Sequence, residues 1–203
     1  MKGRTTLILG GARSGKSRFA LQLGNETGER SFPSPRRGGA PPQKVVRLFG
    51  DPGRGEVQAR KVFLATASPV DPEMKERIAR HQHDRGPSWD TVEAFFDLDR
   101  EIVKIDGRYD VVLVDCLTLW LSNWIMNDSA EETIREKIAG LKEAVQKSTS
   151  TVLLVSNEVG MGVVPPTPMG RAFRDLQGIL NQEMAAVVDE VYFVTAGIPL
   201  RMK

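Results

Sequence analysis

An eight-residue segment near the N-terminus constrains the fold more than any other feature of the sequence. It reads Gly10-Gly11-Ala12-Arg13-Ser14-Gly15-Lys16-Ser17, follows an apolar run at residues 5–9 and precedes a helical pattern at residues 16–24. In a G-x-x-x-x-G-K-S loop the glycines let backbone N–H groups turn towards phosphate oxygens, Lys16 brings positive charge to the β/γ positions, and Ser17 can bind Mg²⁺. The segment therefore predicts a phosphate loop, here residues 10–17, in a nucleotide-binding domain.

Apolar strands alternate with helical patterns along the rest of the chain. Strands are expected at residues 62–67, 111–115, 152–156 and 191–195, and helices at 71–82, 94–105, 131–147 and 171–188. The helix at 71–82 has a clear start, with Asp71 as N-cap, Pro72 in its first position and Glu73 in its first turn. This alternation predicts one α/β domain over residues 1–203, with a mostly parallel sheet covered by helices on both faces.

Residues 28–60 interrupt the alternation. They hold five of the twelve prolines, with seven basic and three acidic residues. Such a segment predicts a flexible surface insertion. It accounts for a local charge of +4, which leaves −2 for the remainder of a chain whose net charge is +2. The fold itself is therefore not expected to carry a basic face, which argues against a nucleic-acid partner.

The composition points to a cytoplasmic protein. No apolar run approaches the ~20 residues that a membrane helix needs. The first apolar run is needed as a strand, so we expect no cleaved signal peptide. Cys116 is the single cysteine, so no internal disulfide can form.

Several polar residues follow the predicted strands, at the edge where parallel sheets bind their ligands. Thr66 and Ala67 end one strand, Asp115 ends the next, and Asn157 and Glu158 follow the fourth. Asp115 is placed to organise Mg²⁺, or else to cap the next helix. Glu158 is a candidate to activate a hydroxyl or hold Mg²⁺, or else a solvated loop carboxylate. Cys116 suits a small core or rim position better than a nucleophile.

The two histidines, His81 and His83, lie near the end of the helix expected at 71–82. They are two positions apart, so they point in different directions and are poor zinc ligands without further Cys or carboxylate partners. A lone histidine is usually structural, so its type alone is weak evidence for catalysis. Asp84, Arg85 and Trp89 follow closely and could line a nucleotide site.

Taken together, these motifs resemble the bifunctional adenosylcobinamide kinase / adenosylcobinamide-phosphate guanylyltransferase family of cobalamin biosynthesis. The most distinctive match is the segment Asn157-Glu158-Val159-Gly160-Met161-Gly162-Val163-Val164-Pro165. The other matches are residues 10–18, 65–67, 71–74, 77–81, Arg85, 89–93, 114–118, Trp124, Arg171, 173–175, Gly178, Asn181, Gln182 and Ala185.

The resemblance implies a fold, an assembly and two reactions. The family fold is a RecA-like P-loop sheet in three layers, mostly parallel with one antiparallel edge strand, assembled as a trimer. The kinase phosphorylates the cobinamide side-chain hydroxyl with ATP or GTP. The guanylyltransferase then attaches GMP from GTP and releases pyrophosphate, through a covalent guanylyl-histidine that aligns with His81.

The resemblance also implies which residues form the site. Catalysis is expected from Lys16 and His81, and Mg²⁺ binding from Ser17 and Asp115. The nucleotide contacts are expected from the phosphate loop (Gly10, Gly11, Ala12, Arg13, Ser14, Gly15, Lys16, Ser17) together with Ala65, Thr66, Ala67, Gln82, His83, Asp84, Arg85, Glu93 and Asp115.

Three features depart from the family pattern. The insertion at 28–60 is extra, and we expect its ends to lie near the nucleotide face. Arg80 replaces a histidine that some members carry before the nucleophile, and Asp115 stands where others have Glu.

Three other functions remain open. One is a plain P-loop kinase for another small hydroxyl compound, in which His81 is inert. The second is a RecA-like ATPase that acts on nucleic acid, which the missing basic face disfavours. The third is a regulatory GTP-binding module, but the chain has no guanine-reading N-K-x-D sequence.

Overall fold

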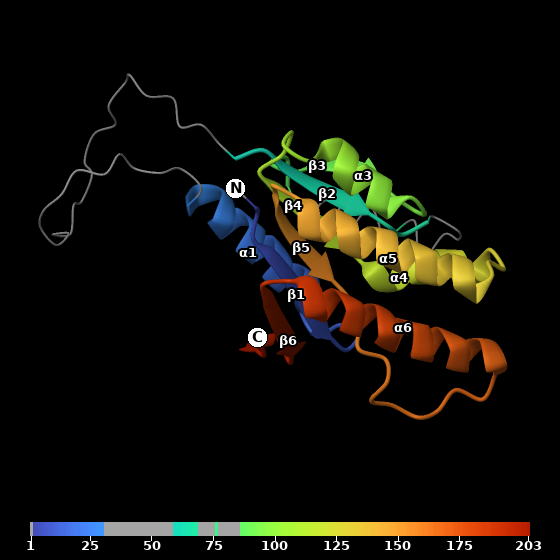
Figure 1. The fold of residues 1–203 in the computed structure, drawn as a ribbon. Coiled ribbons are helices and arrows are strands. Elements are labelled where there is room, and N and C mark those ends of the chain that lie inside the picture. The colour runs from blue at the N-terminus through green and yellow to red at the C-terminus, as the bar shows by residue number, and fades with distance from the viewer. Residues whose placement is uncertain (1, 31–58, 69–75, 77–85) are drawn as a thin grey trace, which may run out of the picture.

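The computed structural model describes residues 2–30, 59–68, 76 and 86–203. Its centre is a seven-stranded sheet in the order β3-β2-β4-β5-β1-β6-β7, in which only the β6–β7 pair is antiparallel (Figure 1). The strands are β1 (Thr5–Gly10), β2 (Lys61–Ala65), β3 (Asp90–Glu93), β4 (Val111–Asp115), β5 (Thr151–Val155), β6 (Glu190–Thr195) and β7 (Ile198–Arg201).

Both faces of the central strands are buried because apolar side chains occupy successive positions of each strand. Alternate residues point to opposite faces. Val112 and Val114 of β4 therefore belong to one apolar cluster, and Val111 and Leu113 to another. Continuous apolar runs of this kind are what a parallel sheet between two helical layers requires.

The helices divide between these two clusters. α1 (Lys16–Arg30) packs against β4 and β5 in the smaller cluster. α3 (Leu98–Ile105), α4 (Leu117–Met126), α5 (Glu131–Lys147) and α6 (Pro168–Val187) contribute to the larger one. Figure 1 shows α5 and α6 lying along the same side of the sheet. This confirms the three-layer α/β fold class with a mostly parallel sheet, and the antiparallel edge strand that the family resemblance implied.

Several element boundaries differ from the sequence predictions. α1 continues through Gly28 to Arg30, so the irregular segment begins later than residue 28. The helix expected from residue 94 begins at Leu98, because Ala94 still donates its N–H to the Ala65 carbonyl, 2.8 Å away. Strand β3 and helix α4 were missed. α4 is apolar around most of its surface and therefore carries no amphipathic signal.

The insertion joins the fold at the edge opposite the phosphate loop, so the expectation that its ends lie near the nucleotide face is wrong. α1 starts at the phosphate loop and runs back along the sheet to Arg30. At the other end of the insertion, Arg60 donates its N–H to Asp110, which immediately precedes β4. A crossover helix reverses the direction of the chain, so both ends meet the amino edge of the sheet. Residues 31–58 of the insertion lie outside the described residues.

Among the described residues, no helix is both long and apolar enough to cross a membrane.

Candidate active site

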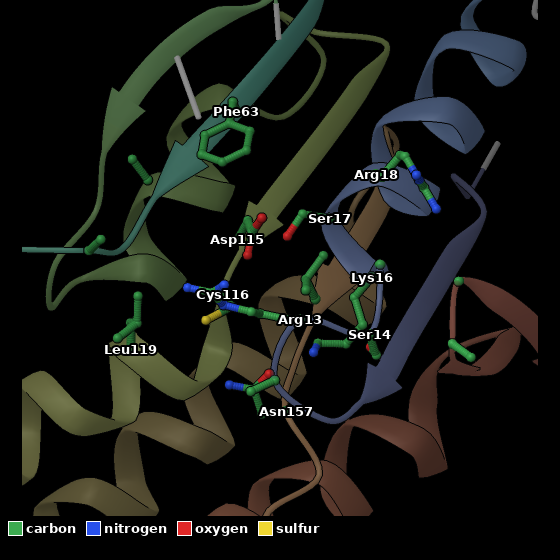
Figure 2. Close-up of a pocket in the computed structure, with 17 residues that line it drawn as sticks. Arg13, Ser14, Lys16, Ser17, Arg18, Phe63, Asp115, Cys116, Leu119 and Asn157 are labelled. Carbon is green, nitrogen blue, oxygen red and sulfur yellow. The ribbon is translucent and has the colours of Figure 1, made fainter. Parts of the chain in front are cut away.

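The carboxyl ends of β1, β4 and β5 meet at one edge of the sheet, where they enclose a cavity of about 540 Å³ (Figure 2). Its lining combines the phosphate loop with strand ends and a hairpin turn, namely Ala12, Arg13, Ser14, Gly15, Lys16, Ser17, Arg18, Phe63, Ala65, Ala67, Asp115, Cys116, Leu119, Val155, Asn157, Ala196 and Gly197. This edge is where open parallel sheets bind their ligands.

The backbone of the phosphate loop adopts the conformation that its glycines allow. Gly15 has a φ of 97° and Gly10 a φ of 152°. A Cβ on Gly10 would lie 2.3 Å from the Val194 carbonyl oxygen, so only glycine lets the loop pass this close to β6. Arg13 also has a positive φ, of 56°. The glycines therefore let the loop pack closely against β6.

Lys16 is the first residue of α1 and lies inside the loop, 7% exposed. Its ammonium group donates to the Gly11 carbonyl across the loop. Arg13 and Arg18 are exposed and also line the cavity, and among the described residues Asp115 is the only carboxylate in the lining. Figure 2 shows Arg13 reaching across the cavity towards Cys116. In the described part of the lining, three cations therefore face one carboxylate, a balance that suits a polyphosphate.

Asp115 and Asn157 end the neighbouring strands β4 and β5 and line the same cavity. The backbone of Asn157 is fixed from both sides. Its N–H donates to the Thr118 hydroxyl (2.8 Å), and its carbonyl accepts from the Asn181 amide (3.0 Å). The Asn157 side chain is left to line the cavity that Asp115 and Ser17 also line.

Thr66 takes a structural position. It is fully buried, and its hydroxyl accepts from the Cys116 N–H (2.8 Å) and donates to the Cys116 carbonyl (2.7 Å). The Asn123 amide donates to the Thr66 carbonyl as well, at 2.9 Å. Thr66 therefore ties the end of β2 to the end of β4, while its neighbours Ala65 and Ala67 line the cavity.

Cys116 is 8% exposed, and its thiol is expected to be unreactive. Burial, reinforced by the neighbouring carboxylate of Asp115, raises the pKa of Cys116 to about 12. The thiolate is the reactive form of cysteine. Cys116 is therefore a poor nucleophile, as its residue type and position suggested.

Glu158 lines a second cavity and not the one that contains Asp115. This second cavity, of about 460 Å³, lies beside the phosphate loop and is lined by Glu158, Met161 and the end of β6. The Glu158 carboxylate accepts from the Gly160 N–H, at 2.6 Å, and its own N–H donates to the Gly10 carbonyl, at 3.0 Å. Glu158 thus stabilises the loop after β5 and is not among the residues that line the cavity containing Asp115.

Two further predicted residues lie away from the cavity. Glu93 is exposed at the end of β3 and is not part of the lining. The suggestion that Trp89 lines a nucleotide site is wrong. Its indole is buried against α1, where a Cβ on Gly24 would lie 2.7 Å from the ring, and its N–H donates to Asn25. Trp89 precedes β3 in the chain, so it lies towards the amino edge of the sheet.

The remaining predicted site residues, His81, Gln82, His83, Asp84 and Arg85, lie outside the described residues, as does most of the helix expected at 71–82. The structure adds lining residues that the sequence did not single out: Phe63, Leu119, Val155, Ala196 and Gly197. Of these, only Ala196 and Gly197 could have been recognised from the sequence, because a small residue and a glycine between two apolar runs are typical of a hairpin turn.

Comparison with known proteins identifies the family. Residues 53–202 match the model of the cobinamide kinase / cobinamide phosphate guanyltransferase family. The chain belongs to this family. The match covers most of the chain and begins after the phosphate loop, so it is independent of that motif.

Curated relatives extend the likeness over nearly the whole chain. Bifunctional adenosylcobalamin biosynthesis protein CobU is 32% identical in Escherichia coli and 34% identical in Salmonella typhimurium. Each alignment covers 97% of this chain and 98% of the relative. Bifunctional adenosylcobalamin biosynthesis protein CobP of Pseudomonas aeruginosa is 34% identical, over 97% of this chain and 96% of the relative.

Among solved structures, a KaiC-like protein from the archaeon Pyrococcus horikoshii matches with a TM-score of 0.47 and 14% identity. The match covers 95% of this chain and 71% of that protein.

Proposed function

We propose that this protein phosphorylates the side-chain hydroxyl of adenosylcobinamide with ATP or GTP and then transfers GMP from GTP to the new phosphate. The observation that carries the proposal is the single cavity shared by the phosphate loop, Asp115 and Asn157, in a chain whose relatives are named as bifunctional enzymes. One phosphate loop can serve both reactions, because each transfers a phosphorus-containing group from a nucleoside triphosphate.

In the kinase step, the substrate hydroxyl attacks the γ-phosphorus and the bond to the β-phosphate oxygen breaks. Lys16 and the N–H groups of the loop stabilise charge on the β- and γ-phosphates. Asn157 lines the same cavity as Asp115, and we propose that its amide donates to the transferred group. The nucleoside diphosphate leaves with its β-phosphate still in the loop.

Mg²⁺ fits this site. Ser17 and Asp115 present one hydroxyl and one carboxylate to the same cavity, and Mg²⁺ is usually held by one or two such ligands together with substrate phosphates and waters. The described residues contain no cluster of three or more His, Cys, Asp or Glu side chains that would hold a metal alone. Bound there, Mg²⁺ would neutralise charge on the β- and γ-phosphates, with Ser17 and Asp115 as its protein ligands.

In the guanylyl step we propose His81 as the nucleophile. An imidazole nitrogen attacks the α-phosphorus of GTP, the bond to the β-phosphate oxygen breaks, and pyrophosphate leaves from the loop. A phosphate oxygen of the phosphorylated cobinamide then attacks the same phosphorus, and the P–N bond breaks to release His81. Neutral imidazole is a competent nucleophile near pH 7, whereas the Cys116 thiol, with a pKa of about 12, is not.

Product analysis tests the two steps together. Adenosylcobinamide, ATP and Mg²⁺ should give a product heavier by one phosphate, and later addition of GTP should add GMP and release pyrophosphate. If the protein phosphorylates adenosylcobinamide but does not transfer GMP, it is a monofunctional kinase and the bifunctional assignment is wrong. ATP hydrolysis that is stimulated by single-stranded DNA, without either product, would favour the nucleic-acid ATPase instead.

Two further expectations join the proposal: assembly as a homotrimer, which the family resemblance implies, and a cytoplasmic location, which the composition indicates. Sedimentation velocity of the purified chain tests the first.

A further inference from the structure

One end of the main cavity is formed by residues with no assigned role. Arg18, Ala196 and Gly197 line this end, and Figure 2 shows Arg18 on the other side of Lys16 and Ser17 from Cys116 and Leu119. Arg18 follows the phosphate loop on α1, whereas Ala196 and Gly197 form the turn between β6 and β7. Two segments far apart in the sequence thus meet beside the loop.

The turn touches the loop through backbone atoms. Thr195 pairs with Ile198, which leaves Ala196 and Gly197 as a two-residue turn with φ values of 50° and 80°. Positive φ at both positions is the mark of a type I′ hairpin turn. The Gly197 N–H donates to the Ser14 carbonyl, at 2.8 Å, so the turn is bonded directly to the phosphate loop.

Gly197 also makes room for Arg18. A Cβ on Gly197 would lie 3.0 Å from an Arg18 guanidinium nitrogen, and a Cβ on Gly15 would lie 3.2 Å from the Gly197 Cα. Arg18 is exposed and, among the described residues, its side chain makes no hydrogen bond or ion pair. The guanidinium of Arg18 therefore lies next to the backbone turn, and its planar face and N–H donors can contact a ligand.

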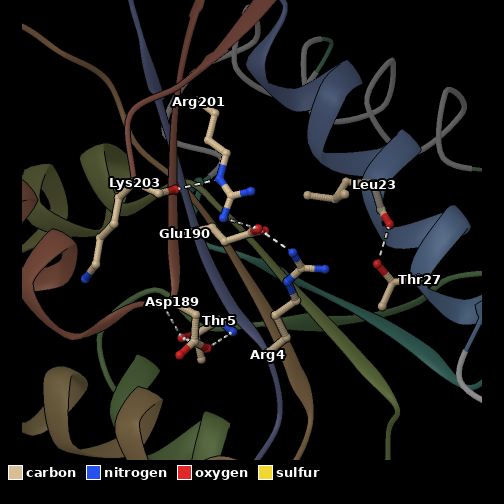
Figure 3. Close-up of polar contacts among 8 residues, drawn as sticks. All are labelled: Arg4, Thr5, Leu23, Thr27, Asp189, Glu190, Arg201 and Lys203. Atoms are coloured by element: carbon tan, nitrogen blue, oxygen red, sulfur yellow. Dashed lines mark hydrogen bonds and ion pairs between the residues drawn. The ribbon is translucent and has the colours of Figure 1, made fainter.

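The other end of the hairpin is fixed to the rest of the fold (Figure 3). Glu190, at the start of β6, has a side chain only 4% exposed and pairs with Arg4 and with Arg201 of β7, the latter at 2.9 Å. Lys203 donates to the carbonyls of Val188 (2.7 Å) and Ala185 (3.0 Å). With its strands anchored in this way, the turn is a fixed wall of the cavity.

The direction of a bound triphosphate follows from the metal ligands. Ser17 and Asp115 would hold Mg²⁺ at their side of the cavity, where the metal would neutralise charge on the β- and γ-phosphates, so we expect the γ-phosphate on that side. The α-phosphate and its nucleoside must then leave the loop on the other side, towards Arg18 and the turn.

We propose that Arg18 and the Ala196–Gly197 turn form a nucleoside subsite, which takes the ribose and base of the triphosphate that donates its γ-phosphate. Arg18 stacks its guanidinium plane on the base, and the turn beside Arg18 forms a wall of the subsite. The subsite rests on the proposed kinase step for its use, but its binding can be measured without a corrinoid.

The test compares two ligands that differ only in the nucleoside part of the site. The affinity for the Mg²⁺ complex of a non-hydrolysable ATP analogue depends on both the phosphate loop and the subsite. The affinity for the Mg²⁺ complex of inorganic tripolyphosphate depends on the phosphate loop alone. Calorimetry on the full chain should show that Arg18→Met weakens the ATP analogue about tenfold, the loss of roughly one stacking contact. Its affinity for tripolyphosphate should stay within about threefold of wild type.

A second variant keeps the turn folded. Gly197→Asn tolerates positive φ but brings a side chain against Arg18, and it should show the same selective loss. Arg135→Met is the matched control, because Arg135 lies on the exposed face of α5 and pairs with Glu131, at 2.7 Å. It should leave both affinities unchanged.

Two outcomes would overturn the subsite. Equal loss of both ligands in Arg18→Met would assign Arg18 to the phosphates. Loss of the ATP analogue in Leu119→Ala, with none in Arg18→Met, would place the nucleoside at the opposite end of the cavity. Failure of the cobinamide kinase assay with selective binding intact would reject the proposed function and leave the subsite standing.

Discussion

The two edges of the sheet use charge in opposite ways. At the carboxyl edge, Arg13 and Arg18 line the main cavity and make no hydrogen bond or ion pair with any described residue. At the amino edge, the carboxylates of Asp106 and Asp189 are bound by hydroxyl and backbone donors. Within the described part of the chain, Arg13 and Arg18 are thus left to contact a ligand, whereas Asp106 and Asp189 hold loops in place.

Asp106 shows how the amino edge is stabilised. It lies just after α3 and accepts hydrogen bonds from the Ser148 hydroxyl (2.7 Å), the Thr149 N–H (2.8 Å) and the Ser150 N–H (3.1 Å). Burial opposes ionisation of Asp106, but these hydrogen bonds outweigh it, so the pKa of Asp106 lies below its ordinary value. Asp189 behaves in the same way, because the backbone N–H and hydroxyl of Thr5 lower its pKa.

The contrast predicts that substitutions at the two edges separate activity from stability. Those at the carboxyl edge should remove catalysis from a protein that still folds, and those at the amino edge should weaken a protein that still works.

The largest expected effect is that of Lys16→Ala on turnover. Loss of a charged contact to the transferred phosphates should cost about 3–4 kcal/mol of transition-state stabilisation, by analogy with the loss of an oxyanion-hole donor. Both reactions should fall by two to three orders of magnitude, while the free energy of unfolding changes by no more than about 1 kcal/mol. Steady-state kinetics and urea unfolding measure the two quantities. Lys142→Ala is the control, since Lys142 pairs with Glu183 between α5 and α6, and near-normal turnover in Lys16→Ala would contradict the assigned site.

Asp106→Asn should show the reverse pattern. Replacing the carboxylate places amide hydrogens among five donors. This should lower the free energy of unfolding by about 2 kcal/mol, with kinase turnover unchanged at 25 °C. Asp128→Asn, on an exposed residue with a φ of 54° that Asn also accepts, should change neither quantity. If Asp106→Asn lost kinase turnover under conditions where the protein is fully folded, the amino edge would contribute to activity, and the contrast between the two edges would be wrong.

The stability difference between wild type and Asp106→Asn should depend on pH. Because the folded pKa of Asp106 is depressed, its stabilisation is complete above its unfolded pKa of about 3.9 and is lost as the pH falls through the folded value. Urea unfolding at pH 7 and at about pH 3 should therefore give a gap that shrinks at the lower pH.

The smallest effect is expected from the insertion. Its flanks, Arg30 and Arg60, lie at the amino edge, away from the cavity. Deleting residues 30–57 and joining the ends should leave nucleotide affinity unchanged and shift the free energy of unfolding by about 1 kcal/mol or less, since loop-closure entropy varies slowly with length. Loss of GTP binding, or of a cooperative unfolding transition, would show that the segment has a structural or catalytic role.

Local patterns predicted the core of the fold and the centre of the site, because each depends on short stretches of sequence. The apolar runs of β1, β4, β5 and β6 were found close to their observed bounds, and the phosphate loop and Asp115 line one cavity. Strand β7 carries no such pattern, since all four of its residues are exposed and one is Pro199.

The rest of the site depends on pairing between distant strands. Thr66 and Ala67 are adjacent in sequence, yet one is buried under Cys116 and the other faces the cavity. Gly197 reaches the phosphate loop only because β6 lies beside β1 and turns back at its end. Neither placement can be read from composition or periodicity, because both require the strand order.

The most direct test of the bifunctional assignment is the intact mass of the protein after incubation with GTP and Mg²⁺. We expect wild type to gain the mass of one GMP, in an adduct that acid releases and alkali does not, as for a phosphoramidate. His81→Ala should show no adduct and no guanylyl transfer while keeping much of its kinase activity, and His83→Ala should retain the adduct. An acid-labile GMP adduct that persists in His81→Ala, or that disappears only in His83→Ala, would contradict the proposed nucleophile.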